Sequence, residues 1–124
     1  MNKLFFEGRI AAAPELRRHG DTAVCKFVVI RNEYAGVDAG GQKRTRKVAV
    51  QFVAFGGLAE TMAANLRTGD QVFIEASIRN NNYNDGERDI YGFDFEIQDF
   101  SFGAPGAESR ERLAARAAEG AGAG

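Results

Sequence analysis

The sequence predicts an all-β domain that contains a single helix. Several runs alternate apolar and polar residues with a period of two, as strands with one buried face do. One run, GLAETMAANLRTG (residues 57–69), has the period of an amphipathic helix instead. The chain of 124 residues is long enough for one domain with one core. The predicted order of elements is β-β-β-α-β-β.

The first half of the chain supplies three predicted strands. KLFFEGRI (residues 3–10) is the first, and small residues and Pro14 close it. AVCKFVVIRNEY (residues 23–34) is rich in β-branched and aromatic residues and forms the second. In the third, KVAVQFVAFGG (residues 47–57), one face carries the apolar residues Val48, Val50, Phe52 and Ala54. The other face carries Lys47, Ala49, Gln51, Val53 and Phe55.

The helix and two further strands follow. Leu58, Met62 and Leu66 are spaced i, i+4 and i+8, and Gly69 is expected to stop this helix. QVFIEASIR (residues 71–79) returns to period two, with its inward set predicted as Val72, Ile74, Ala76 and Ile78. Asp85-Gly86 is a hairpin turn signal. The last strand breaks phase at Gln98-Asp99, which predicts a β-bulge.

The end of the chain has a different composition. Residues 103–124 are dominated by alanine and glycine, and Leu113 is their one large aliphatic side chain. Such a segment buries too little surface to offset chain entropy. The sequence therefore predicts a folded domain over residues 1–102 and a flexible tail over 103–124, with a transient helix within residues 108–119. Removing this tail is expected to leave stability nearly unchanged.

Three strands, a helix and a two-strand hairpin are the order of a five-stranded OB-fold barrel. The face and loops of that barrel bind oligonucleotides or oligosaccharides. Charge is distributed in a way that allows such binding, although the net charge is only −1. KRTRK (residues 43–47) is basic, whereas acidic residues crowd the stretch from Asp85 to Asp99. Separated charges can form a basic groove, and the alternative is that KRTRK is a solvated loop.

Several functional classes are not supported by the sequence. No apolar run approaches the roughly 18 to 20 residues of a membrane span, and the start lacks a secretory signal. One cysteine, Cys25, predicts a reducing cytoplasm. One histidine and one cysteine make no multi-His or Cys-rich metal site. FGGLAE (residues 55–60) lacks the end of a phosphate loop. We expect no enzyme activity and no cofactor.

Motifs spread along the chain resemble the bacterial single-stranded DNA-binding proteins. The matching positions near the start are Asn2-Lys3, Gly8, Pro14-Glu15-Leu16-Arg17, Gly20, Val24 and Phe27. AFGGLAE (residues 54–60) and LRTGDQVFIEASIR (residues 66–79) match further blocks, and the resemblance covers residues 2–102. It implies an OB fold, no catalysis, and a role in replication, recombination or repair at the nucleoid. It also implies a homo-oligomer, usually a tetramer around which DNA wraps.

The resemblance also implies which residues contact single-stranded DNA. Phe55 matches a stacking aromatic on the third strand, and Tyr83 stands where the family has a stacking tryptophan. Arg79 and Asn81 share the predicted face of Tyr83. The expected DNA-binding set is Lys3, Arg17, Tyr34, Arg44, Lys47, Gln51, Phe55, Arg79, Asn81 and Tyr83.

The sequence also departs from the family pattern. It contains no tryptophan, and Ala49 occupies a usual stacking position. Asn81, Asn82 and Gly57 stand where basic residues are typical. In a gapless alignment with the family, the family's second-strand aromatic falls on Ala35, and Tyr34 stands one position earlier. Which face of the strand Tyr34 occupies therefore stays open. The chain ends EGAGAG, without the acidic tip that recruits replication and repair partners in the family, so tail-mediated recruitment is not expected.

Other interpretations of these residues remain. Phe55 by itself would be read as a core residue, and Tyr83 could cap a protein interface. Alternation places Phe73 on the outward side of the fourth strand, and the first strand has apolar residues on both faces, namely Leu4, Phe5 and Phe6. A monomeric barrel would expose some of these side chains, which predicts a homo-oligomer, either a dimer or a tetramer. The alternative function is an OB-fold accessory module, of replication restart or of a mobile element, whose main contacts are with proteins.

Overall fold

The computed structural model describes residues 1–122, and the last two residues of the predicted tail lie outside this range. Its strands are β1 (Leu4–Ile10), β2 (Glu15–His19), β3 (Thr22–Val37), β4 (Lys43–Phe55), β5 (Gln71–Asn80), β6 (Tyr83–Asn84), β7 (Asp89–Ile90) and β8 (Phe93–Phe102). Its helices are α1 (Gly56–Asn65) and α2 (Ala107–Gly122). No helix within residues 1–122 is long and apolar enough to cross a membrane.

Five of the strands form a closed ring. The order is β1-β5-β8-β4-β3, and β3 pairs back onto β1 at Arg9–Ile30 and Ile10–Val29. The β4–β8 pair is parallel and short, whereas the other pairs of the ring are antiparallel. These five strands correspond to the five predicted from the sequence. The sixth strand, β2, extends the sheet beside β3 and was not predicted.

The core of the ring is aromatic and aliphatic. Phe52 is fully buried at its centre, and the rings of Phe6, Phe27 and Phe95 surround it at centroid distances of 5.8 to 6.5 Å. Helix α1 covers this core with Ala59 and Met62, and Leu66, which follows the helix, is also fully buried. The inward alternation predicted for Phe52, Val72 and Ile74 is confirmed.

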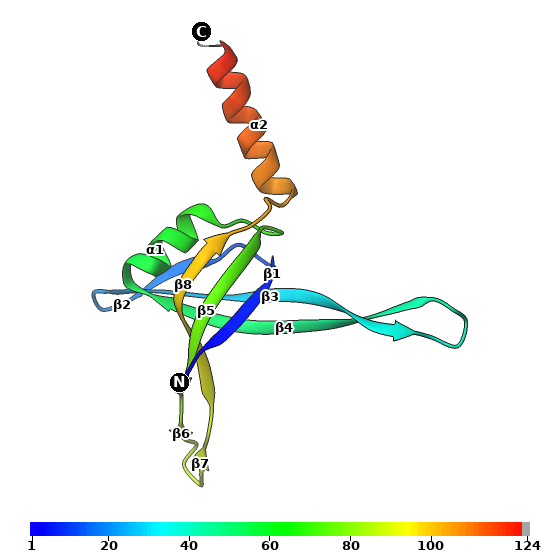
Figure 1. Cartoon of the computed structure of the whole chain (residues 1–124). Helices are drawn as coiled ribbons and strands as arrows, with labels where there is room; N and C mark the ends of the chain where they lie inside the picture. Colours follow the sequence, from blue (N-terminus) through cyan, green and yellow to red (C-terminus); the bar gives the residue numbers. More distant parts are fainter. Residues whose placement is uncertain (123–124) are drawn as a thin grey trace.

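Two arms project from the ring. Figure 1 shows the long β3–β4 hairpin extending away from the barrel and the β6–β7 ribbon extending in a different direction. Because β5 and β8 continue past the core toward this ribbon, Ile78 is exposed, contrary to the inward position that its alternation predicts. The basic run KRTRK is the start of β4 and not a loop, since ladder pairing with β3 overrides its weak strand propensity.

The phase break in the last strand is a β-bulge, as predicted. Glu75 pairs with Asp99, whereas the next residue, Ala76, pairs with Ile97, so Gln98 is the extra residue on β8. The Asp85-Gly86 signal is also confirmed, because the turn between β6 and β7 contains both residues and Gly86 has a φ of 98°.

Most of the segment that the sequence predicts as a flexible tail is helical and forms α2. It runs from Ala107 to Gly122, and Figure 1 shows it pointing away from the barrel. The residues before it continue the hydrogen bonding of the ring, because Gln71 N–H donates to the carbonyl of Ala104 at 2.9 Å and Gly103 N–H donates to that of Gln71 at 2.9 Å. That the helix beyond these contacts is flexible stays a prediction.

Candidate nucleic-acid interface

The outward face of β3 and β4 carries four of the residues expected to bind DNA. Residues directly opposite each other on paired strands point to the same face of the sheet. The rungs of this ladder include Val24–Phe55, Val28–Gln51, Asn32–Lys47 and Tyr34–Thr45. No register shift interrupts the ladder between Val24 and Tyr34. Tyr34 therefore shares a face with Lys47, Gln51 and Phe55, which answers the question that the sequence leaves open.

The rings on this face are accessible to a ligand. Phe55 is 43% exposed and Tyr34 is 65% exposed, whereas Phe52, which points to the other face of β4, is fully buried. Phe55 is therefore not a core residue, and the core interpretation of its alternation does not hold. An exposed ring presents a flat apolar surface on which another planar group can stack.

Strand β2 adds Arg17 to the same surface. Arg17 lies opposite Val24, which in turn lies opposite Phe55, so the three residues form one row across three strands. Arg17 also lines a groove of about 550 Å³ together with Lys26 and Gln51. Its ion pair with Glu15, at 3.6 Å, is highly exposed, and such pairs hold a side chain only weakly. The guanidinium is thus available in the groove.

Lys26 belongs to this surface and was missed by the sequence analysis. It lies opposite Val53, its side chain is exposed, and within residues 1–118 no carboxylate lies within ion-pair distance of it. Strand alternation could have predicted it, because Lys26 lies between the inward-facing Cys25 and Phe27 and therefore points outward. We name the outward surface of Arg17, Lys26, Tyr34, Lys47, Gln51 and Phe55 the hairpin face.

The second arm has a different electrostatic character. Arg79 Nε donates to Glu96 Oε2 at 3.0 Å, and Asn81 Nδ2 donates to Asp94 Oδ1 at 3.4 Å. Glu96 therefore offsets the charge of Arg79. Tyr83 lies further out, opposite Ile90, and is 58% exposed. This arm offers an exposed ring but little uncompensated positive charge.

The turn that carries Tyr83 is held by Asp85. Its carboxylate accepts hydrogen bonds from the backbone N–H groups of Glu87 and Arg88, both at 3.0 Å. These two hydrogen bonds, the one from Glu87 first, lower the pKa of Asp85 below its usual value. The turn is thus fixed by local hydrogen bonds, as Asx turns are.

The remaining expected residues lie elsewhere. Lys3 pairs with Glu75 of β5 at 3.1 Å, away from the paired residues of β3 and β4. Arg44 precedes Thr45 in β4, so strand alternation directs it to the opposite side of the hairpin from Tyr34 and Lys47. The hairpin face thus unites five of the ten expected residues, and the other five lie outside it.

Cys25 belongs to the core and not to either of these surfaces. Burial raises the pKa of the Cys25 thiol to about 11, so this buried group is a neutral thiol at physiological pH. Among residues 1–122, no three His, Cys, Asp or Glu side chains are grouped so that they could hold a metal ion. The hairpin face instead offers rings, cations and an amide to a ligand that carries both planar groups and negative charge.

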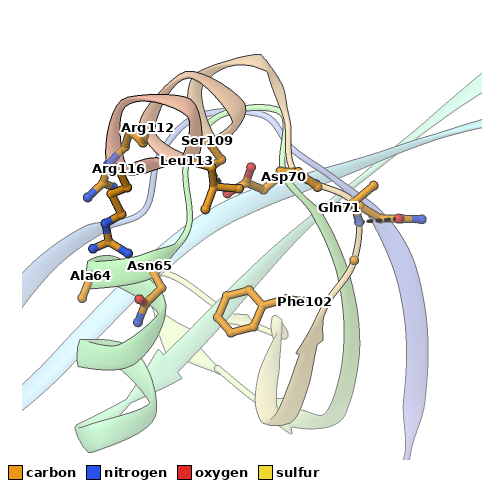
Figure 2. Close-up of a pocket in the computed structure, with 12 residues that line it drawn as sticks. Ala64, Asn65, Asp70, Gln71, Phe102, Ser109, Arg112, Leu113 and Arg116 are labelled. Carbon is orange, nitrogen blue, oxygen red and sulfur yellow. Dashed lines mark hydrogen bonds between the residues drawn. The ribbon is translucent and has the colours of Figure 1, made fainter. Parts of the chain in front are cut away.

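A separate cavity of about 390 Å³ lies where α2 meets the barrel. None of its lining residues comes from β2, β3 or β4. Figure 2 shows Arg112 and Arg116 of α2 extending toward Ala64 and Asn65 of α1, with Asp70 close to Ser109. Asp70 is buried, and its carboxylate accepts hydrogen bonds from Gly106 N–H and from the Ser109 hydroxyl, both at 2.8 Å.

Asp70 thus anchors the start of α2. Arg67 N–H also donates to its carboxylate, at 2.9 Å. Burial raises the pKa of Asp70, but the hydrogen bonds from Gly106, Ser109 and Arg67 together outweigh burial and lower it. A backbone contact reinforces the anchor, since a Cβ at Gly106 would lie 2.6 Å from the carbonyl carbon of Gly69.

Comparison with known proteins shows the family to which this chain belongs. The model of the "Single-strand binding protein family" matches residues 1–101. The chain is 30% identical over 89 residues to the single-stranded DNA-binding protein 1 of Xylella fastidiosa, a match that covers 70% of this chain. It is 31% identical over 106 residues, or 82% of this chain, to the single-stranded DNA-binding protein of Clostridium perfringens. Each match spans 65% of the relative's own length, less than two thirds.

Solved structures agree on the fold. A deletion mutant of the single-stranded DNA-binding protein from Thermus aquaticus superposes with a TM-score of 0.69 at 17% identity, over 82% of this chain and 50% of that one. The Plasmodium falciparum protein in its complex with single-stranded DNA superposes with a TM-score of 0.67 at 18% identity, over 82% of this chain and 94% of that one. The five-strand ring resembles the OB fold of these structures. With residues 1–101 matched, the chain belongs to the single-strand binding protein family, a DNA-binding family without enzymatic activity.

Proposed function

We propose that this chain binds single-stranded DNA with little sequence preference, in DNA replication, recombination or repair within the cytoplasm. The observation that carries the proposal is the composition of the hairpin face. It places two exposed rings, Tyr34 and Phe55, on the same face of β2, β3 and β4 as the cations Lys26, Lys47 and Arg17. Family membership supports the same conclusion.

The chemistry of single strands explains why this combination is suited to them. Every unpaired base exposes a π-face, so a ring can stack on any base without reading its identity. The lysine and arginine groups neutralise phosphates, which accounts for affinity but carries no sequence information. Gln51 lies between the rings and can hydrogen-bond to a base edge or to the sugar–phosphate backbone. A duplex would hide the base faces from Tyr34 and Phe55.

We also propose that the chain is a homo-oligomer, and specifically a tetramer. Phe5 lies opposite Glu75 and Glu7 lies opposite Phe73, so Phe5 and Phe73 share the outward face of β1 and β5. Both rings are exposed and line a groove of about 400 Å³. Exposed apolar patches of this kind mark protein interfaces, and a second copy of this chain is the occupant that the resemblance implies.

Titration of a fluorescent oligo-dT at low and at moderate salt tests the proposal. We expect tight binding at low salt, a fall in affinity with salt, and similar affinity for a mixed-sequence single strand. A duplex of the same length should compete poorly. Absence of binding at low salt, or preference for the duplex, would overturn the proposal.

One observation favours the accessory interaction module as a second candidate. Glu96 offsets the charge of Arg79 on the second arm, and the neutral amide of Asn81 donates to Asp94, so this arm offers little positive charge to phosphates. A module of this kind would fail the oligo-dT titration while still binding a protein partner. The same titration therefore separates the two functions.

A further inference from the structure

A small groove lies where β4 and β8 separate. The two strands pair only at Phe52–Phe95 and Val53–Glu96. Because they are parallel, the residues that precede these rungs lie at the same end of both strands. There β4 continues into the long hairpin and β8 into the ribbon, and Figure 1 shows the two arms diverging. The groove between them measures about 220 Å³.

Phe93 is on the β8 side of this groove. It is 63% exposed and lies opposite Asn80 of β5. Phe95, two residues later, packs against the core with its ring centroid 6.2 Å from that of Phe52, whereas Phe93 belongs to none of the aromatic pairs among the described residues. Single exposed rings are common on protein surfaces, so exposure alone does not indicate that Phe93 binds a ligand. The polar groups around it are the evidence.

Three polar side chains in the groove can each contact part of a nucleotide. Lys26 and Gln51 come from the hairpin face, and Asp94 adjoins Phe93. The Lys26 ammonium suits a phosphate, and the Gln51 amide and the Asp94 carboxylate suit the donors and acceptors of a base edge. Lys26 and Gln51 also line the larger groove that contains Arg17, so the two grooves share a wall.

We propose that Phe93 is an additional base-stacking residue, which holds one unpaired nucleotide in the groove between the two arms. This inference rests on the proposed binding of single-stranded DNA and adds a subsite to it. Lys26 contacts the phosphate of that nucleotide, while Gln51 and Asp94 face its base edge. A strand that follows the hairpin face would reach Phe93 through the shared wall and continue onto the arm of Tyr83.

The test compares variants of Phe93 in the oligo-dT titration. Phe93→Ala and Phe93→Leu both remove the π-face, and each should weaken binding by about fivefold or more without changing the salt dependence, a magnitude taken from other OB-fold single-strand binders. Phe93→Tyr keeps the ring and should bind within about twofold of the parent. Tyr91→Ala is the matched control, since Tyr91 is exposed on the same arm but does not line this groove, and it should leave the affinity unchanged.

The possible results separate this inference from the proposed function. A parent protein that fails to bind oligo-dT overturns both. A parent that binds, with Phe93→Ala and Phe93→Leu equally tight, overturns the Phe93 subsite alone. If Phe93→Ala lowers the assembly mass measured by light scattering, the ring is an interface residue and the subsite is rejected. Thermal unfolding of each variant confirms that the fold is retained.

Discussion

Tyr34 and Thr45 lie directly opposite each other on β3 and β4, and the ladder that joins them continues without a shift to Val24 and Phe55. Two exposed rings therefore occupy one face of the same hairpin, with Lys47 and Gln51 between them. A single strand that runs along this face would meet stacking and phosphate-binding groups in turn.

The positive charge of this face should be visible in the salt dependence of binding. Lys47→Ala should weaken binding to oligo-dT and make the slope of log affinity against log salt shallower by roughly 0.7, the value for one phosphate contact on a single strand. Arg44→Ala is the matched control, because Arg44 is directed to the other side of the hairpin. Equal changes in slope for both variants would show that DNA contacts both sides.

Tyr83 should contribute by stacking and not by charge. Tyr83→Ala should weaken binding to every single-stranded sequence by a similar factor, with an unchanged salt slope, because a neutral ring releases no counterions. Tyr83→Phe keeps the ring and should retain most of the affinity. If Tyr83→Ala binds oligo-dT as tightly as the parent but dissociates the oligomer, Tyr83 is an interface residue.

Alternation along the strands made most of the ring predictable from the sequence. The inward position of Phe52 and the bulge at Gln98 both follow from period-two patterning, which depends on local chemistry alone. Strand β2 was missed because Glu15–His19 is almost entirely polar and charged. It is a strand only because β3 offers it a partner, and such tertiary pairing leaves no pattern in the residues themselves.

The candidate site was only partly predictable for the same reason. Motif resemblance pointed to Phe55 and Tyr83, but the face of Tyr34 depends on the register between β3 and β4. The role of Glu96 beside Arg79 required the β5–β8 pairing. The anchor of α2 joins Asp70 to Gly106 across 36 residues of sequence. It could not be predicted because the segment after Gly103 has few large apolar residues and was expected to be a flexible tail.

The Asp70 anchor should make stability depend on pH. The pKa of Asp70 is lowered in the folded protein, so its stabilisation is complete above the unfolded value of about 3.9 and is lost as the pH falls through the folded value. Asp70→Asn should therefore be less stable than the parent at neutral pH, by about 1 to 3 kcal/mol, and the difference should shrink below about pH 4. Denaturant unfolding at several pH values measures this. A difference independent of pH would contradict it.

Truncations provide the control for this prediction. Deleting residues 110–124 retains the hydrogen bonds from Gly106 and Ser109 to the Asp70 carboxylate, so it should leave stability unchanged. Deleting residues 103–124 also removes the backbone pairing with Gln71. Contrary to the expectation from composition alone, this deletion should therefore destabilise the barrel. Neither deletion should change oligo-dT affinity, because α2 lies outside the hairpin face.

The outward rings of β1 and β5 should hold the oligomer together. Phe73, 47% exposed, lies in the groove beside Phe5, and Phe73→Glu would place a charge in an apolar contact. We expect light scattering at micromolar concentration to give a tetramer mass for the parent and a smaller mass for Phe73→Glu. A parent that is already monomeric would refute the assembly.

The central claim is that the hairpin face is where single-stranded DNA binds, and the absence of tryptophan from the sequence allows a direct test. Phe55→Trp introduces one fluorescent reporter on this face, and Phe73→Trp introduces one on the face of β1 and β5. Addition of oligo-dT should quench the first reporter in step with binding followed by anisotropy, and should leave the second unchanged. Binding by anisotropy with no change in the fluorescence of Phe55→Trp would contradict the claim.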